Sequence, residues 1–155
     1  MCGRFSLVVK KAKLKAQFEL LDESEDVDFL DRFNIAPTQK TVVITSGSPR
    51  VLSLFEWGLV PFWSKNGENT GKLINARAEG IEEKPSFRDP VRLRRCLVPA
   101  DSFYEWKLDP ATGKKRPFRI FPKDGSLLAM AGIYDFWGKD ARPTFSILTC
   151  APNLE

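Results

Sequence analysis

The chain has 155 residues, 43% of them hydrophobic and 28% charged, which fits one soluble globular domain with a sizeable core. Its formal net charge of +4 is compatible with binding a polyanion, and no apolar run is long enough for a transmembrane helix. The sequence has no histidine and only three widely spaced cysteines, which excludes His-dependent nucleophilic catalysis, His-ligated metals and a disulfide framework within these residues.

The chain begins Met1-Cys2-Gly3-Arg4. If Met1 is removed, which a small second residue generally permits, Cys2 carries a free α-amine and a thiol on adjacent carbons. Such a 1,2-aminothiol captures aldehydes, because the amine forms an imine and the thiol then closes onto it as a five-membered thiazolidine. A cysteine that merely follows the start codon is the alternative, and these four residues do not decide between the two.

The remaining sequence predicts one early helix and then mostly strands. Leu14, Phe18 and Leu21 recur at i, i+4 and i+7, which predicts an amphipathic helix over about 10–22, followed by an acidic connection over 22–28. Short β-rich runs separated by turn residues follow, at 41–45, 50–57, 72–77, 94–98, 102–107, 117–121, 127–134 and 143–150. Residues 109–113 form the predicted tip of a hairpin. We therefore expect an α+β fold, with a curved, barrel-like, mainly antiparallel sheet and a few flanking helices.

Several polar and aromatic side chains interrupt these runs. Asn75 and Arg77 share a strand face by the period of two, so that an amide and a phosphate-binding guanidinium lie together. Glu105, between Tyr104 and Trp106, could act as a general acid–base. Each could equally be an ordinary turn or surface residue.

Aromatic and basic residues suggest a nucleic-acid surface. In segment 57–63 we expect Trp57 in the core and Trp63 exposed, where it could stack on a nucleobase. Two basic clusters stand out, one of four arginines within 88–95 and one of four cations within 114–119. Solvated loops are the alternative for each cluster.

Seven segments follow one another in the order seen in one known family: 1–5, 33–39, 57–63, 74–79, 95–106, 130–134 and 146–149. Together they resemble the SRAP (SOS-response-associated peptidase) domain over nearly the whole chain. Members of that family recognise abasic sites in single-stranded DNA and attach to them covalently. The resemblance implies that Cys2, after loss of Met1, forms a thiazolidine with the C1′ aldehyde of the opened sugar. Asn75 would orient the amine and the sugar, and Glu105 would be the general acid–base.

The same resemblance implies a DNA surface and a cellular setting. Arg4 and Arg77 would hold flanking phosphates, and Trp63 would stack where the DNA bends. The expected partner is single-stranded DNA with abasic sites, with no cofactor, no metal and no membrane. A monomer in a bacterial cytoplasm, associated with the nucleoid, is expected. A peptidase activity of Cys2 and Glu105 on the chain's own N-terminus would use the same site.

One departure from the family pattern concerns the C-terminal part. The pattern continues beyond Thr149 to a His-x-Arg-Met-Pro segment, which this sequence does not contain. We therefore expect 1–155 to be a single SRAP-like domain that lacks its C-terminal segment.

Two other kinds of protein remain as alternatives. N-terminal-nucleophile amidohydrolases of the glutaminase type also begin Met-Cys-Gly and use the cysteine thiolate as nucleophile, although no glutamine-pocket segment is found here. A non-catalytic single-strand binding module would bind DNA in a salt-sensitive way and be indifferent to abasic sites.

Overall fold

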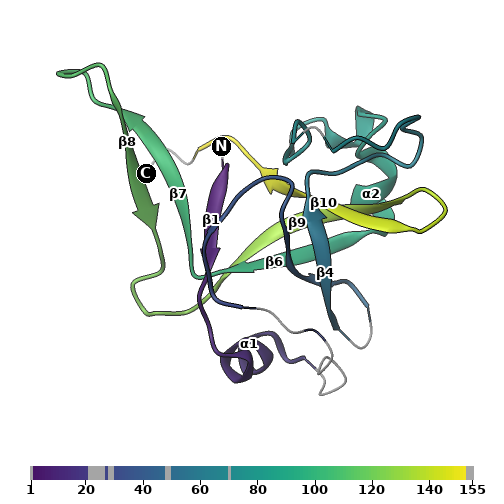
Figure 1. The fold of residues 1–155 in the computed structure, drawn as a ribbon, viewed down its shortest axis with the longest axis horizontal. Coiled ribbons are helices and arrows are strands. Elements are labelled where there is room, and N and C mark those ends of the chain that lie inside the picture. Colours follow the sequence, from purple (N-terminus) through teal and green to yellow (C-terminus); the bar gives the residue numbers. More distant parts are fainter. Residues whose placement is uncertain (1, 21–26, 28–29, 48–49, 70, 153–155) are drawn as a thin grey trace.

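The computed structural model describes residues 2–20, 27, 30–47, 50–69 and 71–152, and its strands form two sheets (Figure 1). The strands are β1 Arg4–Leu7, β2 Arg32–Ile35, β3 Lys40–Thr45, β4 Val51–Trp57, β5 Asn75–Arg77, β6 Arg95–Ala100, β7 Ser102–Leu108, β8 Lys115–Ile120, β9 Leu128–Trp137 and β10 Arg142–Thr149. One sheet has the order β2-β1-β7-β8 and the other β4-β3-β6-β9-β10-β5. Because β4 also pairs with β10, five strands of the second sheet close into a barrel. The predicted fold class is confirmed.

Within the described residues, two α-helices and a short 3-10 helix flank the strands. Helix α1, Lys11–Phe18, buries Leu14 and Phe18 as predicted, and it ends where Glu19 takes a left-handed φ of 52°. The predicted helix was therefore too long; its expected residues 21 and 22 lie outside the described part of the chain. Helix α2, Arg88–Leu93, and the 3-10 helix η2, Ile81–Glu83, were not predicted. Arg94, just after α2, forms an ion pair with buried Asp135 (Nε–Oδ1 3.2 Å), so the first basic cluster is partly structural.

A corner at Asp101 connects the barrel to the four-stranded sheet. β6 belongs to the barrel and β7 to the other sheet, with this one residue between them. The carboxylate of Asp101 accepts a hydrogen bond from the backbone N–H of Val8 (2.8 Å) and pairs with Arg119 (2.7 Å). The corner therefore fixes the direction in which β7 and β8 leave the barrel.

β4 and β5 occupy the same edge of β10, one after the other. Residues Thr144 and Phe145 pair with the end of β4, and Ile147 to Thr149 pair with β5, both in parallel. The chain leaves this edge after Trp57 and returns at Asn75, forming a loop over 58–74. Backbone and side-chain bonds anchor the loop, including Val60 N–H to Thr144 Oγ1 (2.8 Å). The excursion places Asn75 at the start of a strand whose position is set by β10.

Stacked aromatic rings in the core join the two sheets. The ring of Phe5 on β1 meets that of Trp57 edge-on, with centroids 5.0 Å apart, and Trp57 lies parallel to Phe145 at 6.4 Å. All three side chains are fully buried, which confirms the expectation that Trp57 belongs to the core. The packing holds β1, and with it the N-terminus, against the barrel.

Gly132 on β9 is tightly enclosed by its neighbours. A Cβ at this position would lie 2.9 Å from Cys96 Sγ and 3.1 Å from the carbonyl oxygen of Ser146. We expect Gly132→Ala to lower the free energy of unfolding by about 1–3 kcal/mol, because neither the thiol nor the strand backbone can move freely. Urea unfolding measures the loss, and Cys96→Ala in the same chain is expected to recover part of it. An unchanged unfolding midpoint would show that the barrel wall adapts at this point.

Candidate active site

Cys2 lies just before β1, half-buried against the main hydrophobic core. Its thiol donates a weak hydrogen bond to the carbonyl oxygen of Arg4, with an S–O distance of 3.8 Å. Burial, and secondarily the negative charge of Glu105, raises the pKa of the Cys2 thiol to about 11. The thiol is therefore protonated at neutral pH, and a reaction at sulfur needs a group that accepts its proton.

Asn75, the first residue of β5, contacts Cys2 directly. Its Nδ2 donates a hydrogen bond to the carbonyl oxygen of Cys2 at 2.9 Å. Its Oδ1 is buried and has no hydrogen-bond partner within the described ranges. An unpaired buried carbonyl costs roughly 1–3 kcal/mol, and such atoms in native structures call for an explanation. Asn75 therefore holds the first residues of the chain and presents an acceptor beside them.

Glu105 lies on β7, the neighbour of β1 in the four-stranded sheet. β1 and β7 are antiparallel, with Arg4 opposite Tyr104, so the residues before Arg4 run alongside Glu105. Its negative charge is one of the causes of the raised pKa of the Cys2 thiol. The aromatic residue directly across the ladder from Glu105 is Phe118. Tyr104 and Trp106, its neighbours in sequence, lie on the opposite face of β7 because side chains alternate along a strand.

The structure therefore groups Cys2, Asn75 and Glu105, which come from three strand segments far apart in sequence. In Figure 1 the N-terminal end of β1 lies between the barrel and the β7–β8 hairpin, close to the end of β10. Cys2 and Asn75 are joined here by the 2.9 Å hydrogen bond, and the charge of Glu105 acts on the Cys2 thiol.

Two of the three residues expected to bind DNA are exposed side chains on β5 and on the loop before it. Arg77 is exposed at the end of β5, on the same face as Asn75, with buried Ala76 between them. Trp63 is 53% exposed on the loop over 58–74, next to Phe62, which is 58% exposed. The predicted exposure of Trp63 is confirmed, and the DNA-binding roles of Trp63 and Arg77 remain proposals.

Arg4 has a different setting. As the cross-strand partner of Tyr104, it leaves the sheet on the face opposite to that of Glu105, where its Nη1 donates to Asn34 Oδ1 (3.0 Å). There it lines a pocket of about 290 Å³ together with exposed Phe33 and Trp106. Arg4 therefore lies on the face of the sheet opposite to that of Glu105, and its role in DNA binding remains a proposal.

Sequence reasoning missed β2 and the side chains it presents here. One extra residue of β2 opposes β1 between Phe5 and Leu7, a β-bulge that disrupts the ladder. Phe33 and Asn34 lie in this stretch and are exposed. Bulges redirect side chains beside functional sites. The segment 33–39 entered the sequence analysis only as part of a family pattern. The signal that could have indicated a functional role was an aromatic residue next to a polar one.

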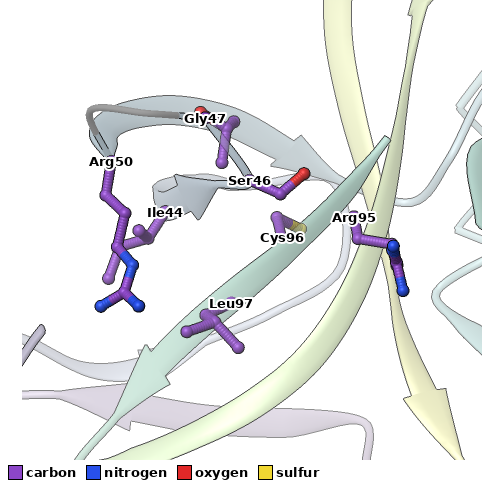
Figure 2. A pocket seen from close by; sticks show the side chains of 8 residues that line it. Ile44, Ser46, Gly47, Arg50, Arg95, Cys96 and Leu97 are labelled. Atoms are coloured by element: carbon purple, nitrogen blue, oxygen red, sulfur yellow. The ribbon is translucent and has the colours of Figure 1, made fainter. Parts of the chain in front are cut away.

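A second pocket, of about 320 Å³, lies at the N-terminal end of β6, whereas β7 follows its C-terminal end. Figure 2 shows Arg50 and Arg95 on opposite sides of this pocket, with Cys96 between them. Burial raises the pKa of the Cys96 thiol to about 12, so this cysteine is neutral and unreactive. The pocket is separate from the group of Cys2, Asn75 and Glu105.

Two further findings bear on the site. Within the described part of the chain, no group of three or more cysteine or carboxylate side chains is placed to hold a metal ion. No helix in the same residues is long and apolar enough to cross a membrane.

Comparison with curated proteins and solved structures identifies relatives over the whole chain. The chain is 43% identical over 158 residues to the abasic site processing protein YoqW of Bacillus subtilis, covering 99% of the chain and 70% of that protein. It is 31% identical over 199 residues to the abasic site processing protein HMCES of Pongo abelii, covering 96% of the chain and 56% of that protein.

Solved structures give the same result. The fold is similar to a crystal structure of a protein from Bacteroides thetaiotaomicron, with a TM-score of 0.84, 34% identity, and coverage of 98% of this chain and 69% of the other. A Bordetella bronchiseptica protein of 21% identity has the same fold, with a TM-score of 0.79 and coverage of 99% of this chain and 74% of the other. The model of the SOS response associated peptidase (SRAP) family matches residues 1–155. The chain belongs to the SRAP family.

Proposed function

We propose that this protein, once Met1 is removed, binds abasic sites in single-stranded DNA and becomes covalently attached to them through Cys2. The observation that carries the proposal is the grouping of Cys2, Asn75 and Glu105. Support also comes from relatives, which are named abasic site processing proteins. An abasic site is the one place in a DNA strand where the sugar opens to an aldehyde, the functional group that an N-terminal aminothiol captures.

The first step joins the α-amine of Cys2 to the C1′ aldehyde. The amine adds to the carbonyl carbon, and the resulting hemiaminal loses one water to give an imine. Asn75 already binds the Cys2 carbonyl, which fixes the orientation of the residue, and its buried Oδ1 is an acceptor for the amine or a sugar hydroxyl. Holding the two reacting groups in place converts a rare bimolecular encounter into an intramolecular reaction.

The second step closes the ring. The sulfur of Cys2 adds to the imine carbon, its proton is lost, and the imine nitrogen gains a proton, giving a thiazolidine. With the pKa of the thiol at about 11, proton removal from sulfur is a difficult part of this step at neutral pH. Glu105 accepts that proton and returns one to nitrogen, and it also assists opening of the sugar. Overall the reaction releases one water and needs no oxidant or cofactor.

The proposed product implies that the protein turns over slowly. A thiazolidine leaves no free aldehyde, so the lesion is shielded from strand cleavage while the protein stays attached. The peptidase activity in the family name fits the same groups, because removal of Met1 is what creates the reactive amine. Arg77 and Trp63 are both exposed, and in this proposal they bind the DNA that flanks the abasic site.

The test is a denaturing gel with three oligonucleotides. The processed chain is incubated with single-stranded DNA carrying one abasic site, with the same DNA carrying a tetrahydrofuran analogue that has no aldehyde, and with intact DNA. We expect a shifted band with the first only, and none with a chain that retains Met1. A band with all three would mean that the attachment does not use the aldehyde, and salt-sensitive binding without any band would leave a plain single-strand binding protein.

A further inference from the structure

The β7–β8 hairpin is the most exposed strand pair among the described residues. β8 lies at the edge of its sheet and pairs with β7. All six residues of β8 are exposed, as are the last three of β7. In Figure 1 the hairpin extends away from the barrel, so both faces of its outer half are open to solvent. A strand pair of this kind, with several exposed apolar side chains, is typical of a contact surface.

The face of the hairpin that carries Glu105 continues outward from the candidate active site. Phe118 lies opposite Glu105 across the ladder, and the next pair on that face is Lys107 and Arg116. A pocket of about 260 Å³ is lined by these outer three residues together with Leu108, Asp109 and Pro110. It is slightly smaller than most ligand pockets, which suits one base or phosphate group better than a whole cofactor.

The charge on this face is positive. Arg116 pairs with Asp109 at 2.9 Å, but its side chain is 67% exposed, which leaves other N–H groups open to solvent. No ion pair or hydrogen bond engages the Lys107 ammonium within the described residues. Of the second basic cluster of the sequence, over 114–119, Arg116 lies on this face, Lys115 lies on the opposite face and Arg119 pairs with Asp101.

The spacing fits a nucleic-acid backbone. Lys107 follows Glu105 by two residues on the same strand, which corresponds to about 7 Å along the hairpin. This is comparable with one nucleotide step of an extended single strand. With the abasic sugar at Cys2 and Glu105, a neighbouring phosphate reaches the pair of cations, and a neighbouring base reaches the half-exposed ring of Phe118.

We propose that this face of the hairpin, defined by Lys107, Arg116 and Phe118, is an arm that binds the single-stranded DNA on one side of the abasic site. Phe118 stacks on a base, and Lys107 and Arg116 hold phosphates. Alternation of cations with aromatic rings is how proteins bind single strands without reading their sequence. The inference rests on the proposed function and adds to it the residues that hold the flanking strand.

A protein partner fits the same hairpin less well. Addition of a partner strand needs the N–H groups of the edge strand β8, and Pro117 in its middle has none. The cationic face also favours a polyanion over a peptide without negative charge.

The test measures binding of the tetrahydrofuran analogue, which cannot form a covalent bond, by fluorescence anisotropy across a salt series. Three oligonucleotides are compared: one with the analogue in the middle, one with it at the 5′ end and one with it at the 3′ end. Lys107→Ala is matched with Lys115→Ala, which removes the same charge from the opposite face of the hairpin. Phe118→Ala tests the stacking contact, and thermal melting confirms that each variant is folded.

We expect Lys107→Ala to weaken binding several-fold and to reduce the slope of log affinity against log salt concentration by about one. Both effects are expected for the central oligonucleotide and for only one of the two oligonucleotides with the analogue at an end. Phe118→Ala is expected to weaken binding of the same two oligonucleotides by about tenfold. Lys115→Ala is expected to change none of the three by more than about twofold. The proposed arm would be contradicted by equal losses of affinity for Lys107→Ala and Lys115→Ala. Losses of affinity that are the same for all three oligonucleotides would also contradict it.

The arm and the proposed function fail in different ways. If the wild-type chain forms no adduct with abasic DNA but the flank-dependent losses are seen, the arm stands as a DNA contact and the covalent function is wrong. If the adduct forms and the variants bind every oligonucleotide as the wild type does, the arm alone is wrong.

Discussion

Cys2→Ala is expected to abolish the stable adduct with abasic DNA while leaving non-covalent binding of the tetrahydrofuran analogue within about twofold. Alanine keeps the α-amine, so an imine still forms, but there is no sulfur to close the ring and the imine hydrolyses. Because Cys2 is only half-buried, loss of its sulfur has a small effect on folding. A denaturing gel without reductant measures the adduct, and anisotropy measures binding.

Cys2→Ser is the matched control for this prediction. Serine has nearly the same size, but its hydroxyl is a much weaker nucleophile than sulfur. We expect borohydride to trap the imine of Cys2→Ser as a permanent adduct, and little adduct to survive without borohydride. An adduct of Cys2→Ala that withstands heating without reductant would show that another residue forms the bond.

Glu105→Gln is expected to slow adduct formation by about 100-fold or more while leaving analogue binding nearly unchanged. The size of the effect is the usual contribution of one general acid–base. Glutamine has the same shape and cannot accept the thiol proton. Single-turnover rates at saturating DNA between pH 5 and 8 test this, and equal rates for the two proteins across that range would remove Glu105 from the mechanism.

The same substitution is expected to make the Cys2 thiol more reactive toward a simple alkylating reagent. Glu105 raises the thiol pKa by its negative charge, so its removal lowers that pKa and increases the thiolate fraction below pH 11. We expect alkylation by iodoacetamide at pH 9 to be several-fold faster at Cys2 in Glu105→Gln, with exposed Cys150 as the internal reference. A crosslinking rate that falls while thiol reactivity rises separates proton transfer from general damage to the site. Alkylation of Cys2 that is unchanged or slower would show that Glu105 does not act on the thiol.

The fold could be predicted where local sequence determines structure. The run of β-branched residues at 41–45 became β3, and the turn-rich segment at 109–113 became the hairpin tip. The short strands β1 and β2 were missed, because four residues give little alternation and their pairing is long-range. At 72–74 a strand was expected, yet the carbonyl oxygens of Leu73 and Ile74 accept bonds from the side chain of Ser146 and the N–H of Ile147. These contacts form only when the barrel closes.

The candidate site was predictable in part. The shared face of Asn75 and Arg77 follows from the period of a strand. The grouping of Cys2 with Asn75 and Glu105 does not, because it depends on the pairing of β1 with β7 and of β5 with β10. The resemblance to a known family supplied that grouping. The opposite face taken by Arg4 was not foreseen, since it follows from the register with Tyr104.

The most direct measurement of the central claim is the intact mass and peptide map of the product formed with a short abasic oligonucleotide. The account predicts the mass of the chain without Met1 plus the mass of the DNA less one water, with the modification on the N-terminal peptide that begins at Cys2. A product attached elsewhere, or a processed chain that stays unmodified after long incubation with abasic DNA, would contradict it.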